Sequence, residues 1–574
     1  MKKILSITAA FLLACTSCDV LDTKDLSHYN SDIWNDSKLT SAYLTNLYSG
    51  VFTGGWPLDG GTSDECNGIM GKDAVQPNNN QFKFWPYASI RNINTMLQNL
   101  ETSTLASNIK DPMKGEAMFL RAFQYFKMVR LFGGVPIIKT PQSIDDDLMV
   151  KRNSTAECFE FILSDLDEAA KLLPVKSESN SYGRIDQCIV AAFKSRVLLY
   201  KASPQFNPSN QYGNPYWKDA YTAAKQAKEL LDQNGFGLLD NYTDVFETKK
   251  HKEAILPVCF VNPSKTNGRQ EAGVRPLSES KNSTGIDQPT WGLAEAFPMK
   301  DGKKVGESSK YAYDVQTFWE NRDPRFDAVI VYNGAIYELS GKAGRRQYTA
   351  ANIANSLDAF GENIQGEHHF RTGLYCKKGI QEELPVAEVT LNDVDWLEIR
   401  YAEVLFNYAE TANENGSTSE GYEVLKAIRK RAGIEPGSDN MYGLKQGMSQ
   451  TEMRMALLDE KRIEFCFEGQ RFYDLRRHRL IHTYLNGQHK YGILATLKAN
   501  VDEDDALKRF GNNTLMPEEF DYKVVDLVFQ DQNAESAMWI PETYYFFPIA
   551  KSEIEKNPNL EQNNSWGGNF EPAL

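Results

Sequence analysis

Residues 450–477 read QTEMRMALLDEKRIEFCFEGQRFYDLRR and combine a helical spacing of apolar residues with a high density of charge. The spacing predicts a helix over the whole stretch. Glu464 and Arg471 lie among apolar neighbours here, as do Arg121, Arg400 and Glu403 elsewhere in the chain. Because an unpaired charge in a protein interior is costly, we expect these side chains to form ion pairs that lock the scaffold.

Helical patterns continue on both sides of this stretch, and blocks 36–234 and 396–480 are predicted to be mainly helical. Asp111-Pro112 is typical of a helix start, Gly133-Gly134 of a helix end, and Ser154 with Glu157 of a capping box. Small residues recur where paired helices approach, which resembles degenerate tetratricopeptide repeats. The other predicted helices are 37–51, 84–100, 154–173, 186–202, 216–234, 396–415 and 419–432.

The middle of the chain, 235–395, is rich in glycine, proline and asparagine and has little periodicity. Short apolar pieces at 254–261 and 326–332 predict strands, and the rest is expected to be loop. Long loops in a compact domain are often functional, so we expect this irregular subdomain on the ligand side. Residues 481–574 are predicted to be a C-terminal loop segment.

Composition narrows the function classes. The chain has 574 residues, 41% of them hydrophobic, so a large core is expected. A net charge of −14 argues against nucleic acid and anionic lipid as partners. Aromatic residues make up 11% of the chain, which suits both a rigid core and a surface that stacks on flat ligands.

Six segments carry recognisable motifs in a fixed order: 116–136, 289–303, 321–325, 400–410, 460–476 and 548–563. Together they resemble the SusD/RagB family of nutrient-binding outer-membrane lipoproteins. The resemblance implies a mostly α fold of four tetratricopeptide-like helix pairs plus an irregular subdomain. It also implies an oligosaccharide or glycan ligand, a cell-surface address, and a SusC-like TonB-dependent transporter as partner. Some family members bind peptides or glycopeptides instead.

The N-terminus has the pattern of a lipoprotein signal peptide, residues 1–17. Lys2 and Lys3 precede an apolar run of about eleven residues that is too short to span a bilayer. The run ends in a lipobox-like LLACTSC, in which Cys15 and Cys18 are alternative lipidation sites. The residues after Cys18 are similar to the family pattern, so we expect Cys18 to be acylated and 18–574 to be the mature SusD-like domain, anchored by lipid to the outer membrane.

Carbohydrate sites need aromatic rings for the apolar faces of sugars and polar side chains for their hydroxyls. One candidate region is the glycine-rich turn around Trp56, with Asp64 and Asp73 as polar partners. The other is the middle loop, with Trp291, Tyr311, Tyr313 and Trp319. The alternative for each aromatic residue is ordinary packing in the core.

No catalytic residues, cofactor or metal site are predicted, and the chain is expected not to be an enzyme. His478 and His482 have helical zinc-ligand spacing but no third ligand in the sequence. The chain has no phosphate loop and no G-x-S-x-G elbow. With 77 acidic residues, a carboxylate pair of a glycoside hydrolase stays an open alternative. The eight cysteines are scattered, which leaves any disulfide pairing open.

Overall fold

A computed structural model describes residues 31–574 except 54–55, 57–61, 69, 282–284, 354–355, 361–371 and 528–536. The predicted signal peptide and both candidate lipidation cysteines lie outside the described residues. Within the described residues, no helix is both long and apolar enough to cross a membrane.

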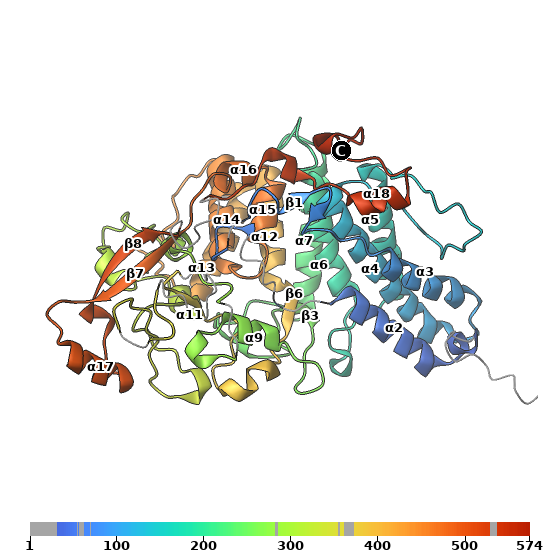
Figure 1. Cartoon of the computed structure of the whole chain (residues 1–574). Coiled ribbons are helices and arrows are strands. Elements are labelled where there is room, and N and C mark those ends of the chain that lie inside the picture. Colours follow the sequence, from blue (N-terminus) through green and yellow to red (C-terminus); the bar gives the residue numbers. More distant parts are fainter. Residues whose placement is uncertain are drawn as a thin grey trace, which may run out of the picture.

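The scaffold is a row of helices that pack side by side in chain order (Figure 1). This confirms the mostly α, tetratricopeptide-like architecture. Each helix contacts the next one in the series, including α7 and α12, which are separated by more than 160 residues of sequence. The row consists of α2 (Ser37–Val51), α3 (Tyr87–Thr102), α4 (Ser107–Phe132), α5 (Thr155–Leu172), α6 (Gln187–Ala202), α7 (Tyr216–Gln233), α12 (Tyr401–Glu414), α13 (Thr418–Ala432) and α14 (Gln450–Glu464).

Side-chain caps begin several of these helices. The carboxylate of Asp36 accepts from the N–H groups of Lys38 and Leu39 at the start of α2, and the capping box of Ser154 and Glu157 is formed at the start of α5. The predicted start of α4 at Asp111 is wrong: the helix begins at Ser107 and Pro112 lies inside it. A proline there removes only its own N–H bond, and the preceding turn still closes on the carbonyl of Ala106.

The loop-rich subdomain is an insertion between the neighbouring helices α7 and α12. Its base is a two-stranded antiparallel pair, β3 (Ala254–Val258) with β6 (Trp396–Arg400). It also contains β4 (Ile330–Val331), which pairs with β5 (Tyr375–Cys376). Its short helices are α8 (Asp244–Glu247), α9 (Gly268–Val274), α10 (Trp291–Ala296) and α11 (Pro324–Val329).

Three expected elements differ in the structure. The strand at 254–261 is confirmed as β3, but 326–332 is mainly α11, because Asp323 caps a helix that starts at Pro324. The helix expected from residue 396 starts at Tyr401, since the first five residues pair with β3 as β6. The helix expected over 450–477 is interrupted after Glu464 by positive φ angles at Phe467 and Gly469, and resumes as α15 (Arg471–Arg477).

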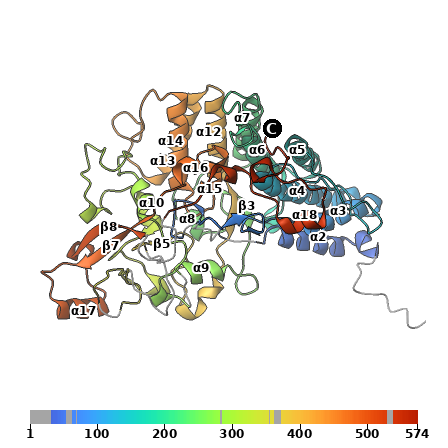
Figure 2. The same ribbon diagram turned by 45° about the horizontal axis from the view of Figure 1, so that its top comes forward.

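Residues 481–574 contain regular elements that the sequence did not predict. An antiparallel hairpin of β7 (Tyr491–Leu497) and β8 (Phe520–Asp526) flanks α17 (Glu503–Gly511), and α16 (Ile481–Tyr484) and α18 (Lys551–Lys556) lie outside the hairpin. The hairpin and α17 project from the end of the molecule opposite α2 and α3, as both views show (Figures 1 and 2).

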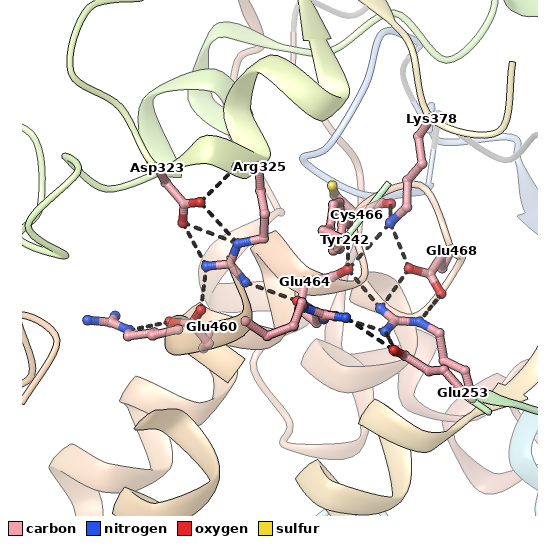
Figure 3. A network of polar contacts seen from close by, with 12 residues as sticks. Tyr242, Glu253, Asp323, Arg325, Lys378, Glu460, Glu464, Cys466 and Glu468 are labelled. Carbon is pink, nitrogen blue, oxygen red and sulfur yellow. Dashed lines mark hydrogen bonds and ion pairs between the residues drawn. The ribbon is translucent and has the colours of Figure 1, made fainter. Parts of the chain in front are cut away.

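A buried charge network lies where α14 meets the insertion (Figure 3). The guanidinium of Arg325, on α11, bonds Asp323, Glu460 and Glu464 at 2.6–3.0 Å. The network continues through Arg400 and ends at Lys378 on Glu468. Five cations meet five carboxylates, so the buried charges balance. They are Arg325, Lys378, Arg400, Arg429 and Arg431 with Glu253, Asp323, Glu460, Glu464 and Glu468.

Candidate ligand-binding site

A cavity of about 390 Å³ lies where the N-terminal helices meet the base of the insertion and the C-terminal helices. This volume is within the range of small-molecule sites, ~300–1,000 Å³. Helices α2, α4 and α6 line one side, β3 and β6 the next, and α12, α14 and α15 the rest. The lining side chains used below are Trp56, Phe123, Phe126, Lys127, Arg130, Arg196, Trp396, Glu398, Glu403, Lys461, Glu468, Gln470, Tyr473, Asp474 and Arg477.

Two tryptophans lie next to each other in the aromatic part of the wall. The rings of Trp56 and Trp396 meet edge to face with centroids 5.3 Å apart, and Phe246 lies 5.6 Å from Trp56 on another side. Trp56 is only 6% exposed, yet its indole nitrogen has no hydrogen-bond partner among the described residues. The nitrogen is itself buried, and a buried N–H without an acceptor costs free energy.

The polar part of the wall is held rigid by Arg196. Its guanidinium binds Glu403 at 2.6 Å and Glu398 at 2.7 Å. The second oxygen of Glu398 accepts from the Trp396 indole N–H at 3.2 Å, and the amide of Gln470 donates to Glu403 at 3.4 Å. Although burial opposes it, the two carboxylates hold the pKa of Arg196 above its usual value. These contacts fix the orientation of the wall before any ligand arrives.

Two further cations line the cavity from α4. The ammonium of Lys127 lies 4.4 Å from the ring centre of Phe84, and the guanidinium of Arg130 stacks 3.6 Å from the ring centre of Tyr473. Burial lowers the pKa of Lys127, with Glu398 acting in the opposite direction. The cavity thus combines ring faces with hydrogen-bonding groups, as a saccharide site requires.

The structure places the three residues of the first predicted region apart. Trp56 lines the cavity, whereas the Asp64 carboxylate binds Arg471 at 3.0 Å and Arg462 at 3.1 Å. Despite burial, these guanidinium groups hold the pKa of Asp64 well below its ordinary value. Asp73 is exposed, and its backbone carbonyl accepts from Asn79. Neither aspartate lines the cavity.

The four aromatic residues of the second predicted region lie in the insertion and also outside the cavity. Trp291 is buried in the core of the insertion, with its ring edge against Phe318. Trp319 is half-buried and stacks on Tyr332. Tyr311 donates to Glu435 at 2.6 Å, and Tyr313 lies beneath the guanidinium of Arg322. In the structure these rings pack against other residues of the insertion or, for Tyr311 and Trp319, also against Glu435 and Tyr522. Their ligand contact stays a prediction.

Several cavity residues escaped sequence reasoning. Lys127 and Arg130 follow Phe123 and Phe126 at helical spacing, so two cations share an apolar face of α4. This combination of aromatic residues and cations on one helix face was the sequence signal that could have predicted a ligand-binding role. Trp396 was missed because residues 396–415 were expected to form a helix. A helix at this position gave no reason to place Trp396 beside Trp56.

The histidines predicted not to bind metal have separate partners. His478 contacts Glu410 at 3.2 Å and Tyr212 at 3.0 Å, and His482 contacts Glu542 at 3.3 Å. Within the described ranges, no group of three or more His, Cys, Asp or Glu side chains is arranged to hold a metal ion. Five cysteines of the described part of the chain are free thiols: Cys158, Cys188, Cys259, Cys376 and Cys466.

The fold and the cavity define a class of protein: a helical-repeat scaffold with a loop-rich insertion and a ligand site at their junction. Residues 252–566 match the SusD family model, and residues 56–199 match a model described as starch-binding and associating with the outer membrane. The chain therefore belongs to the SusD family.

Relatives and solved structures agree with this assignment. SusD-like protein P2 of Formosa agariphila is 24% identical over 432 residues, which cover 74% of this chain and 76% of that protein. A crystal structure of a SusD-like protein from Bacteroides fragilis superposes with a TM-score of 0.71 at 24% identity, covering 93% and 98% of the two chains. A SusD-like carbohydrate-binding protein of the same species gives 0.70 at 23% identity, covering 92% and 99%.

Proposed function

We propose that this chain binds an oligosaccharide at the outer-membrane surface, without cleaving it, and delivers it to a SusC-like TonB-dependent transporter. The cavity at the junction of scaffold and insertion is the proposed capture site. Trp56 and Trp396 cover a sugar face, and the amide of Gln470 serves its hydroxyls. Cys18 is the proposed lipid anchor, with Cys15 as the alternative.

The cavity with its paired tryptophans is the observation that carries this proposal. A concave wall of rigid aromatic rings beside fixed polar groups suits the amphipathic faces of a sugar. The carbohydrate-binding B. fragilis protein has the same fold, and the model matched by residues 56–199 is described as starch-binding. Both support a carbohydrate ligand here.

The state of the cavity carboxylates favours binding over hydrolysis. A glycosidase needs one carboxyl group free to protonate the leaving oxygen and a second free to act on the sugar or a water. All four acidic residues of the wall are already in ion pairs: Glu398 and Glu403 with Arg196, Glu468 with Arg400, and Asp474 with Lys461.

The test is calorimetric titration of the full chain in detergent with a panel of oligosaccharides, including glycopeptides and peptides as alternative ligands. We expect saturable binding of at least one saccharide, with no release of reducing ends. Trp396→Ala should reduce the affinity roughly tenfold or more, as loss of a stacking aromatic residue does. Reducing-sugar release by the purified chain would contradict the proposal.

Trp539→Ala is the matched control. Trp539 is 37% exposed and does not line the cavity, so its removal should leave affinity unchanged. Loss of binding in Trp539→Ala with full retention in Trp396→Ala would move the site to the outer surface. Co-purification with the transporter, compared between the chain and a Cys18→Ser variant, tests delivery and anchoring separately.

A further inference from the structure

Lys127 and Arg130 differ from the other cations of the cavity wall. Arg196, Lys461 and Arg477 each lie within ion-pair distance of a carboxylate. Among the residues that the structure describes, neither Lys127 nor Arg130 has a carboxylate within that distance. Both side chains lie on one face of α4, three residues apart, and both line the cavity.

The printed contacts of the two charged groups are with aromatic rings and not with carboxylates. Arg130 rests on the rings of Tyr473 and Phe126, and its Nε–H is buried without an acceptor in the described part of the chain. Lys127 rests on Phe84 and Phe123. Ring faces hold a cation in place, but they stabilise it less than an anion does.

The charge of the cavity is opposite to that of the whole chain. Five cationic and four acidic side chains line it, whereas the chain has a net charge of −14. The buried network nearby is balanced charge for charge (Figure 3). A surplus of positive charge in a concave, partly desolvated site is typical of sites that bind anions.

We propose that the saccharide captured in this cavity is acidic, and that Lys127 and Arg130 bind its carboxylate or sulfate group. The inference rests on the proposed saccharide binding and adds the substrate class. The guanidinium of Arg130 offers N–H groups in a fork that matches a carboxylate or sulfate. Lys127 adds a second charge one helical turn away on the same wall.

The geometry assigns separate tasks to the two halves of the site. Trp56 and Trp396 cover the ring of a sugar unit, and α4 holds the anionic substituent. Burial lowers the pKa of Lys127. In the free protein, nearby negative charge therefore does not fully offset the cost of burying its ammonium group. A bound anion offsets more of that cost, and the affinity should therefore fall as salt screens the pair.

The experiment compares acidic saccharides with neutral ones. Full-length protein in detergent is titrated with an oligogalacturonide, with its methyl ester, with a sulfated galactan oligosaccharide, and with a neutral oligosaccharide of the same length. We expect the oligogalacturonide or the sulfated galactan to bind at least about tenfold more tightly than the neutral ligands, as for a hydrogen bond to a charged group. Comparison of the two acidic probes shows whether the site prefers a carboxylate or a sulfate group.

Variants locate the anion. Lys127→Met and Arg130→Met keep most of the side-chain packing and remove the charge, and each should reduce the affinity for the acidic probe about tenfold or more. Arg130→Lys retains the positive charge and should recover part of the affinity that is lost in Arg130→Met. Lys225→Met is the matched control, since Lys225 is exposed on α7, outside the cavity. Thermal unfolding of each variant shows whether it is folded.

The outcomes separate the two proposals. Affinity for neither acidic probe above that for the methyl ester and the neutral oligosaccharide overturns the acidic substrate class and leaves saccharide binding standing. Unchanged affinity for the acidic probe in folded Lys127→Met and Arg130→Met does the same. Failure of all four saccharides to bind overturns the proposed function itself. The inference is supported if an acidic probe binds tightly, if this binding is lost in both α4 variants, and if it is retained in Lys225→Met.

Discussion

The guanidinium of Arg400 on β6 lies 2.8 Å from the carboxylate of Glu464 on α14. The contact joins the base of the insertion to the last helix of the scaffold row, and Glu464 lies in the middle of the network in Figure 3. Arg400 also binds Glu253 at 2.9 Å and Glu468 at 2.8 Å. One side chain therefore fixes the entry of the insertion, its exit and the turn after α14, which together shape one wall of the cavity.

Removal of one partner of this pair should destabilise the protein strongly. Arg400→Met leaves Glu464, Glu253 and Glu468 buried with less compensation, and such losses cost about 3–5 kcal/mol. Urea unfolding monitored by circular dichroism measures the change. Lys171→Met, which breaks an exposed i, i+3 pair with Glu168, should leave the midpoint unchanged. A midpoint for Arg400→Met equal to that of Lys171→Met would show that the network is not needed for stability.

The same network predicts lability in acid. Burial raises the pKa of Glu464, but Arg431, Arg400 and Arg325 outweigh it and hold the pKa well below the ordinary value. Below pH ~4.3 the unfolded chain takes up a proton at this position while the folded chain does not, so the stability present at higher pH is lost. Unfolding free energies between pH 3 and 7 should show a shallower slope in Glu464→Gln. Parallel slopes in the two proteins would contradict the assignment.

Gly379 should be required for the position of Trp56. A Cβ at Gly379 would lie 2.6 Å from Cζ2 of Trp56, and the backbone φ is +72°. Gly306 has a φ of +78° and open space around it, so Gly306→Ala reports the backbone strain alone, about 1–2 kcal/mol. Gly379→Ala should cost more than this control, and it should weaken saccharide binding as well. Equal unfolding midpoints for the two variants would rule out the steric contact.

A buried lysine predicts an alkaline effect. Burial lowers the pKa of Lys490 to about 8, while its ammonium donates to the carbonyl of Cys66 at 2.7 Å. Between pH 8 and about 10.4 the folded chain has lost this proton and the unfolded chain retains it, so stability rises with pH. The wild type should gain up to about 3 kcal/mol relative to Lys490→Met across this range. Denaturant titrations at pH 7.5, 9 and 10 provide the measurement.

Local chemistry accounts for what the sequence predicted well. The capping box of Ser154 and Glu157, the stop at Gly133 and the helical spacings depend on contacts within a few residues. The ion pairing of the helical charges was also predictable, since a buried charge needs a partner. Their partners were not: Arg121 binds Asp165, Glu403 binds Arg196, and Arg471 binds Asp64.

By itself, the sequence determined the helical class, most helix positions, the family and the need for buried pairs, because each depends on short-range spacing or on burial alone. Tertiary structure alone decided that residues 396–400 form a strand, since the hydrogen bonds of β6 go to β3 more than 130 residues away. It also brought Trp56 beside Trp396 and both beside the cations of α4. Such a site depends on contacts between segments that are distant in the sequence, and no local sequence pattern specifies which of these segments meet.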